Sequence, residues 1–427
     1  MAVNALEAFI LMGNDINLNS SPKRRYGIRD EALVDLASSY GVPFPASVDA
    51  LTGPKISGKL HFIENKIYDF CRISEIMNLS ISTNHHANSG PVCRLLEAIV
   101  AYITKIEPDR KVIAVNSGTS ALHLACNFHG IARKNLEMRW VTSAFTFKSS
   151  TSSTLSNSIV IDSDPKGRFD LNRLKELSLE SYDGVIFTNV FSQMADWADV
   201  ATFCKENNKK LVIDNATGLL DRIKTPVNGE QPIEIISAHH TKPWGVGECG
   251  MILCTSDQEL TIRNLTNFGK DTILRTRSAS SNFKLSDLAA AAIIDRLERM
   301  PFWVPLYHKQ ERRMAKIIAD ELRNITSLQG TTKPKSPRSY APFCNETPIH
   351  KFDNTEFLTV GKYYNPLGLG TEYNMDISNS LDLYSKILCI PNAPEYFTIS
   401  SDEIANDIKK IQNNSTKIYR ELHDLDR

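Results

Sequence analysis

The sequence lacks several features that would assign the protein to a class at once. No apolar run approaches the roughly 20 residues of a membrane span. Neither charge is in excess, because Lys and Arg total 49 and so do Asp and Glu, and we therefore expect no nucleic acid or membrane partner. The eight cysteines show no Cys-x-x-Cys pair or zinc spacing, which favours reduced thiols over a metal site. Residues 1–7 have no basic stretch before a short apolar piece, so we expect no secretory signal and a cytoplasmic protein.

What is present is an ordinary globular composition, 42% hydrophobic and 23% charged over 427 residues, which predicts one large domain plus a smaller one. Short apolar runs alternate with helical patterns, as is typical of a mostly parallel sheet buried on both faces. The expected strands are residues 111–115, 140–142, 159–162, 184–187 and 211–214, with helices between them that include 171–179 and 200–207. The fold class is therefore α/β, with ligands at the carboxyl ends of the strands, where 116–120, Asn189 and Asp214 fall.

One lysine stands out, Lys242, in the stretch 236–250. The glycines at 245, 247 and 250 match Gly-x-Gly-x-x-Gly, but a dinucleotide loop must follow a strand and open a helix. Here they lead into the strand-like residues 251–254, so we reject that interpretation. A lysine at a corner between strands, preceded by the strand-end acid Asp214, suits a pyridoxal phosphate enzyme, in which a lysine forms the Schiff base and an acid faces the pyridine nitrogen.

A candidate anion site follows the first expected strand. Residues 116–120, Asn-Ser-Gly-Thr-Ser, open a helix, and the free N–H groups and dipole of a helix start favour a phosphate. An ordinary Ser/Thr helix cap explains the same residues equally well.

The first 80 residues show no chemistry. Residues 19–25 are interpreted as a loop or exposed arm, and residues 29–40 as a helix. The polar loop 82–91 contains His85 and His86, but no acid or cysteine lies nearby in the sequence to complete a metal site. We therefore interpret it as a loop that faces substrate.

The sequence after residue 254 has patterns that predict mainly helices, at residues 260–268, 285–300 and 310–325, with a last helix at 400–425. Residues 278–282 and 331–342 are expected loops, and the prolines within 300–305 are expected to break the chain. The predicted divisions are 1–80, an N-terminal arm and helical segment, 81–305, a large cofactor-binding domain, and 306–427, a small C-terminal domain.

Five short motifs, in order, resemble the DegT/DnrJ/EryC1/StrS family of pyridoxal phosphate enzymes, the aminotransferases of nucleotide-linked keto sugars. They are Ser-Gly-Thr-Ser-Ala-Leu-His-Leu-Ala at 117–125, Phe-Thr-Phe at 145–147, Ile-Asp-Asn-Ala at 213–216, Ser-x-His-x-Thr-Lys at 237–242 and Asn-Phe-Lys-Leu-Ser-Asp at 282–287. The resemblance runs from about Ser82 to the C-terminus. It implies the aspartate-aminotransferase-like fold, fold type I, with a mostly parallel seven-stranded sheet between helices and a smaller α+β domain.

The same resemblance implies two catalytic residues. Lys242 should bind the cofactor covalently and then move the proton between the substrate carbon and the cofactor carbon, for which burial should lower its pKa. Asp214 should keep the pyridine nitrogen protonated. The alternative for Asp214 is a buried strand-end acid satisfied by backbone N–H groups.

Further cofactor contacts are implied in the same way. Gly118, Thr119 and Ser120 should hold the phosphate, with the Ser237 hydroxyl added, although Ser237 could also be a turn residue. Phe147 should stack on the pyridine ring, its alternative being a core residue.

Two more residues, Asn282 and less surely Lys284, should reach the phosphate from a neighbouring subunit, which implies a homodimer with shared active sites. A solvated surface charge is the alternative for Lys284.

The chain departs from the family pattern at three places. Residues 189–193 read Asn-Val-Phe-Ser-Gln where the family usually has His-x-x-Gly. Thr217, near the expected position of the cofactor's phenolic oxygen, stands where glutamine or histidine is frequent, and the N-terminal arm is longer than expected. These departures leave the sugar and the aminated position open.

The resemblance therefore implies an aminotransferase that works by a ping-pong scheme. Its donor would be an amino acid, with glutamate expected, and its acceptor a nucleotide-linked keto-deoxysugar in surface-polysaccharide or deoxyaminosugar biosynthesis. A sugar dehydratase of the same family is the alternative; such relatives carry histidine in place of the lysine, and His239 and His240 lie close by. A non-catalytic regulator should lack the lysine, the aspartate or the phosphate loop, all of which are present. Other fold type I chemistry, such as decarboxylation or Cα–Cβ cleavage, is disfavoured only by the family resemblance.

Overall fold

The structure is a computed structural model. It describes residues 28–45, 60–193, 197–222, 231–269, 279–322, 324–328, 335–349, 355–368 and 376–425, with side chains of the last helix through residue 413. The predicted arm at 19–25, residue 278 and residues 331–334 lie outside the described residues.

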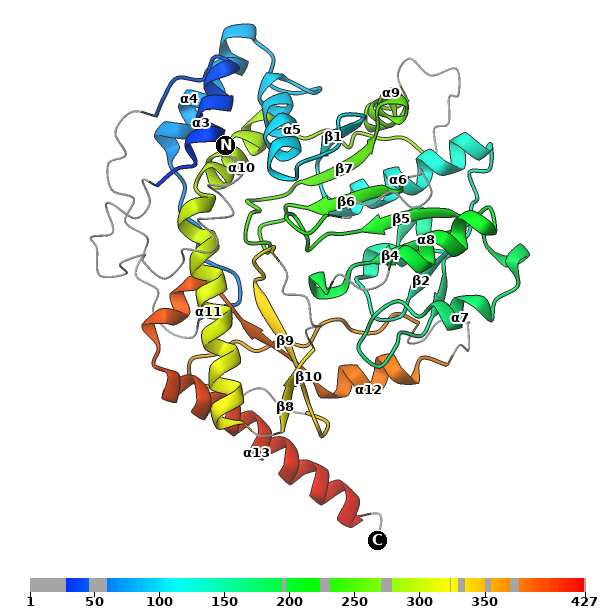
Figure 1. The fold of residues 1–427 in the computed structure, drawn as a ribbon, viewed down its shortest axis with the longest axis vertical. Helices are drawn as coiled ribbons and strands as arrows, with labels where there is room; N and C mark the ends of the chain where they lie inside the picture. The colour runs from blue at the N-terminus through cyan, green and yellow to red at the C-terminus, as the bar shows by residue number, and fades with distance from the viewer. Residues whose placement is uncertain are drawn as a thin grey trace.

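A seven-stranded sheet lies at the centre of the part of the structure that includes residues 110–255 (Figure 1). Its spatial order is β1-β7-β6-β5-β4-β2-β3. The strands are β1 (Arg110–Val115), β2 (Trp140–Ser143), β3 (Ile159–Ile161), β4 (Gly184–Thr188), β5 (Lys210–Asp214), β6 (Ile233–Ser237) and β7 (Gly250–Thr255). Strands β3, β2, β4, β5 and β6 run parallel, while β7 is antiparallel to both of its neighbours. The predicted fold class, a mostly parallel α/β sheet, is confirmed.

Helices cover both faces of this sheet because successive strand residues point to opposite sides. Ile236 packs into one core with α5 and α10, whereas its neighbour Ile235 packs into a second core with α6 and α9. Towards the other end of the sheet, Ile213 belongs to a third core with α7 and α8. The helices and 3₁₀ turns of this part of the structure and of the segment before it are α3 (Glu31–Ser39), α4 (Phe70–Thr83), α5 (Pro91–Ile103), α6 (Gly118–Arg133), η1 (Lys148–Thr151), η2 (Ser153–Leu155), α7 (Leu171–Lys175), η3 (Leu179–Ser181), η4 (Val190–Ser192), α8 (Trp197–Glu206), α9 (Ser256–Thr266) and α10 (Asp287–Glu298).

The expected chain break at 300–305 is wrong. Only Arg299 separates the end of α10 from the start of helix α11 (Met300–Glu321). Pro301 lies in the first turn of α11, where the N–H group that proline lacks would have no intrahelical acceptor. The helix predicted at 310–325 therefore begins at Met300. Its first part, through Tyr307, packs into the core that contains Ile236, and Ile317 and Ile318 pack into a separate core.

That separate core belongs to the C-terminal part of the chain, where a three-stranded antiparallel sheet lies beside α11 and α13 (Figure 1). Its elements are β8 (Ile325–Ser327), β9 (Tyr340–Asn345), α12 (Ser378–Lys386), β10 (Ile387–Pro391), η5 (Pro394–Thr398) and α13 (Ser401–Leu425). The loop predicted at 331–342 is wrong at its end, because β9 begins at Tyr340.

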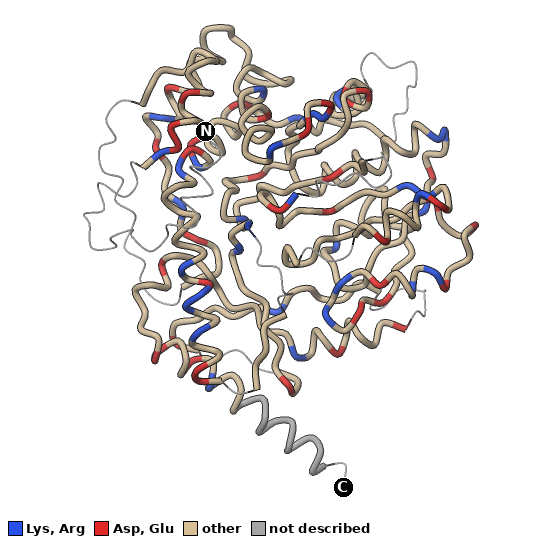
Figure 2. Tube along the Cα trace, viewed as in Figure 1, with Lys and Arg blue, Asp and Glu red and all other residues tan. Residues whose placement is uncertain are grey.

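Acidic and basic residues are interspersed along the described trace (Figure 2), as the equal totals of the two charges lead one to expect. Among the residues that the structure describes, no helix is both long and apolar enough to cross a membrane.

Candidate active site

A cavity of about 550 Å³ lies at the carboxyl ends of β4, β5 and β6. The last residue of each of these strands lines it: Thr188, Asp214 and Ser237. This placement follows from the parallel strands, whose carboxyl ends meet at one edge of the sheet. Of the predicted site residues, those that line the cavity are Gly118, Thr119, Phe147, Asp214, Thr217, Ser237 and Lys242.

Lys242 and Asp214 are ionisable groups of the cavity wall that influence each other electrostatically; Asp214 is buried and Lys242 is half-buried. Burial lowers the pKa of the Lys242 amine, and the attraction of the Asp214 carboxylate opposes this shift. Burial raises the pKa of Asp214 to about 6, while the Ala216 N–H group, 3.1 Å from Oδ1, and Lys242 both oppose the rise. An amine with a lowered pKa is a nucleophile and a base near neutral pH, which a surface lysine is not.

The start of α6 supplies the candidate anion site. Ser117 caps the helix, since its Oγ accepts from the Ser120 amide at 3.1 Å and lies 2.9 Å from the Ser120 hydroxyl. Ser120 is thereby committed to the cap and does not line the cavity, whereas helix geometry leaves the amides of Gly118 and Thr119 without intrahelical acceptors. The helix-cap interpretation is therefore confirmed for Ser117 and Ser120, and the anion site stays a prediction for the amides of the two residues before Ser120.

Glycine is required where this helix start meets the strands. A Cβ atom on Gly118 would lie 2.8 Å from the Cβ atom of Ser237, and one on Gly250 would lie 2.1 Å from the Ser117 carbonyl oxygen. These close approaches bring two free amides and the Ser237 hydroxyl together at the cavity. Amides, a hydroxyl, a half-buried lysine and a buried aspartate are the set of groups that pyridoxal phosphate needs, so the residues present fit this cofactor.

Aromatic side chains form much of the remaining cavity wall. Phe147 is 51% exposed, so it is not a core residue. The rings of Phe191 and Tyr364 stack with centroids 5.4 Å apart, and those of Tyr340 and Tyr363 stack at 5.1 Å.

Phe62 also lines the cavity, with its ring centroid 5.9 Å from that of Tyr340. The first 80 residues thus contribute a ring to the cavity wall, and the expectation that they carry no chemistry stays a prediction. Phe62 and the tyrosines of the wall come from segments far apart in the chain, and no local motif marks them.

The segment that departs from the family pattern also borders the cavity. Phe191 and Ser192 adopt positive φ angles of 53° and 55°, an uncommon conformation for residues other than glycine. The Ser192 hydroxyl lies 3.2 Å from the Thr217 hydroxyl and also donates to the Thr217 carbonyl. Asn189 donates to Asn215 at 2.8 Å. The segment is thus held by side-chain hydrogen bonds around Thr217.

Asn282 and Lys284 do not line the cavity of their own chain. Lys284 Nζ lies 2.7 Å from the Asn267 side-chain oxygen, so it is paired on the surface within its own chain. His85 and His86 are exposed and also lie outside the cavity of their own chain, so the substrate-facing loop stays a prediction. Among the described residues there is no group of three His, Cys, Asp or Glu side chains that could hold a metal ion.

Known proteins share both the sequence pattern and the fold. The model of the DegT/DnrJ/EryC1/StrS aminotransferase family matches residues 73–409. The dTDP-4-amino-4,6-dideoxy-D-glucose transaminase of Shigella dysenteriae is 23% identical over 348 residues, which cover 76% of this chain and 91% of the relative.

Solved structures of similar fold include DesI in the presence of its TDP-sugar product, with a TM-score of 0.69, 18% identity and coverage of 87% of this chain and 97% of that chain. Another is PseC of Helicobacter pylori, an aminotransferase of pseudoaminic acid biosynthesis, with a TM-score of 0.66, 16% identity and coverage of 83% and 100%. A third is NtdA of Bacillus subtilis with bound PMP, with a TM-score of 0.66, 16% identity and coverage of 84% and 86%.

Proposed function

The chain belongs to the DegT/DnrJ/EryC1/StrS aminotransferase family, whose enzymes depend on pyridoxal phosphate, and we propose that it transfers an amino group from glutamate to a nucleotide-linked keto-deoxysugar. The observation that carries this proposal is the meeting of Lys242, Asp214 and the start of α6 at one cavity. Two relatives of similar length are described by their dTDP-sugar or TDP-sugar products, which supports a nucleotide sugar as acceptor. The product would enter surface-polysaccharide or deoxyaminosugar biosynthesis.

Each residue of the site has a defined task in this proposal. Bound pyridoxal phosphate supplies an electron sink for the substrate carbon that loses a proton. The Lys242 amine holds the cofactor and, when released from it, takes the proton from one carbon and returns it to another. The Asp214 carboxylate keeps a proton on the pyridine nitrogen by accepting its hydrogen bond. Gly118 and Thr119 amides, with the Ser237 hydroxyl, bind the phosphate, and Phe147 covers one face of the ring.

The dehydratase alternative receives no support from the neighbouring histidines. His239 has Nδ1 2.9 Å from the Thr241 hydroxyl and Nε2 3.1 Å from a Glu248 carboxylate oxygen, so both ring nitrogens have partners other than Lys242 and Asp214. Lys242, by contrast, lines the cavity with Asp214, whose charge acts on the pKa of its amine.

We further propose a homodimer in which Asn282 completes the partner's site. Its position outside its own cavity, on an exposed segment beside the start of α6, supports this arrangement. The Asn116 side chain, which precedes that helix, donates to the Asn282 carbonyl at 3.4 Å.

The function is tested by incubating the enzyme with nitrogen-15 glutamate and a panel of nucleotide keto-sugars, followed by mass spectrometry. We expect one 2-oxoglutarate released for each labelled nitrogen that appears in the sugar product. The half-reaction with glutamate is common to both alternatives, so the sugar product decides between them. A deoxygenated sugar without label would overturn the proposal in favour of dehydration.

A further inference from the structure

Residues 239–247, which we call the lysine loop, carry Lys242, and side chains from other parts of the chain bind the backbone of this loop. Each of the four carbonyl oxygens of residues 240–243 accepts a hydrogen bond from a side chain outside the loop. The Lys66 ammonium group donates to two of them, the carbonyls of His240 and of Lys242 itself, the latter at 2.7 Å. One side chain thus bridges the backbone on both sides of Thr241.

The two remaining carbonyls are bound from different parts of the fold. The Ser339 hydroxyl donates to the Thr241 carbonyl, and Arg296 Nε donates to the Pro243 carbonyl at 2.8 Å. Ser339 precedes β9, Arg296 belongs to α10, and Lys66 belongs to residues 60–72, which we call the anchor segment. Three separate regions therefore converge on one short loop.

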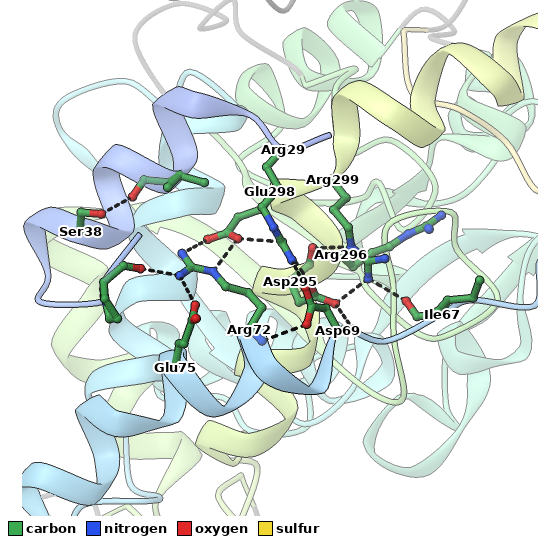
Figure 3. Close-up of polar contacts among 12 residues, drawn as sticks. Arg29, Ser38, Ile67, Asp69, Arg72, Glu75, Asp295, Arg296, Glu298 and Arg299 are labelled. Atoms are coloured by element: carbon green, nitrogen blue, oxygen red, sulfur yellow. Dashed lines mark hydrogen bonds and ion pairs between the residues drawn. The ribbon is translucent and has the colours of Figure 1, made fainter. Parts of the chain in front are cut away.

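Buried ion pairs fix the anchor segment on α10 (Figure 3). Arg72 bonds both carboxylate oxygens of Glu298, at 2.9 and 2.7 Å, and Asp69 pairs at 2.6 Å with Arg29, which also reaches Asp295 at 3.1 Å. The side chains of these five residues are at most 9% exposed. Because breaking a buried pair leaves an uncompensated charge, the segment cannot lift away without a large free-energy cost.

A further pair connects this anchor to the lysine loop. Arg296, which holds the Pro243 carbonyl, also pairs with Glu64 of the anchor segment, 3.2 Å between Nη1 and Oε1. The position of Lys66 is therefore set on both sides, by Glu64 before it and by Asp69 and Arg72 after it.

We propose that Lys66 is a positioning residue for Lys242, which fixes the lysine loop in its working conformation before the cofactor binds. The segment that carries it lies before residues 73–409, the part matched by the family model. The inference goes beyond the proposed function, and takes from it only that Lys242 is the cofactor lysine. The conformation of the loop can be measured without that assumption.

The charge of the Lys66 donor depends on its surroundings and on pH. Burial and the nearby Arg296 lower the pKa of Lys66 to about 7, against the attraction of Glu64 and Glu395, and Lys242 lowers it further.

The test is hydrogen exchange of residues 239–247, followed by mass spectrometry, in the full-length protein with and without cofactor. Amides of this loop, including those of Lys242 and Gly245, bond to carbonyls within it, so their exchange reports its opening. Lys66→Met, which keeps the apolar stem but removes the donor, should speed exchange on the order of tenfold or more through loss of two charge-assisted hydrogen bonds. Lys66→Arg, which keeps charge and donors, should stay closer to wild type.

The matched control is Thr359→Val. The Thr359 hydroxyl donates at 2.6 Å to the Leu60 carbonyl, so this variant loosens the anchor segment without touching the lysine loop. Its exchange at 239–247 should equal that of the wild type. Equal acceleration by Thr359→Val and Lys66→Met would overturn the proposal, because docking of the segment alone would then explain the effect.

Two additional measurements separate positioning from general stability. Lys66→Met should bind pyridoxal phosphate more weakly and lower kcat while leaving the KM for glutamate nearly unchanged, because Lys66 contacts the loop rather than substrate. Unchanged loop exchange together with unchanged cofactor affinity would refute the role of Lys66. If Lys66→Met does not fold, Lys66→Gln, which keeps one donor group without charge, is compared with Lys66→Arg under the same criteria.

Discussion

Replacing Asp214 by asparagine should stabilise the cofactor-free protein while abolishing most of its turnover. Asp214 is buried, and its pKa is raised to about 6 from an ordinary value of 3.8. An ionised carboxylate is therefore less favourable in the folded than in the unfolded chain. Asparagine has nearly the same shape, keeps an oxygen for the Ala216 amide and carries no charge to bury.

The expected gain follows from proton linkage. A rise of about two pKa units corresponds to roughly 3 kcal/mol at pH values above 6. Between pH 3.8 and about 6 the folded protein binds more protons at this site than the unfolded chain, so wild-type stability from this group is present below pH 3.8 and is lost as pH rises through 6. The advantage of Asp214→Asn should thus be near zero at pH 4 and reach its full size at pH 7.

Urea unfolding of the two cofactor-free proteins, followed by tryptophan fluorescence from pH 4 to pH 8, measures this difference. In the loaded enzyme the same variant should lose turnover, because a neutral amide cannot keep the pyridine nitrogen protonated. If the difference in unfolding free energy between Asp214→Asn and wild type did not change with pH, the argument that ionised Asp214 destabilises the folded protein would be refuted. Near-normal turnover would refute its assigned role in the reaction.

Three further outcomes follow from the same geometry. Borohydride treatment of the wild-type enzyme should attach the cofactor to Lys242, located by peptide mapping, and cofactor found on another lysine would contradict the assignment. Gly118→Ala should weaken cofactor binding on the order of tenfold or more, because its new Cβ atom would lie 2.8 Å from the Ser237 Cβ atom and displace an amide donor. Equal affinity of Gly118→Ala and wild type would show that the α6 start does not hold the phosphate. Mixed Lys242→Ala and Asn282→Ala subunits should regain about one quarter of wild-type activity, because half of the dimers are then hybrids with one intact site in two; no recovery despite subunit exchange would mean that each site is built from one chain.

Features encoded in short stretches of sequence could be predicted without the structure. The continuous apolar runs at β4 and β5 indicated a sheet buried on both faces, because only such strands have no solvent side. Lys242, Asp214 and the residues of the α6 start were identified because each lies in a local pattern of strand end, corner or helix cap. Parallel strands then bring such ends to one edge, so their meeting was also foreseeable.

Contacts between distant segments were decided only by the tertiary structure. Phe62, Lys66 and Tyr363 stand in no motif, and an isolated aromatic or lysine carries no signal of what it will contact. Prolines within 300–305 predicted a break, yet Pro301 falls in the first turn of α11, a position that depends on where α10 happens to end. Sequence pattern thus determined the sheet, the lysine and its acid. Packing of the N-terminal segment and the region of β9 decided the aromatic wall and the hold on the lysine loop, because hydrogen bonds and ring contacts between residues far apart in the chain depend on the fold as a whole.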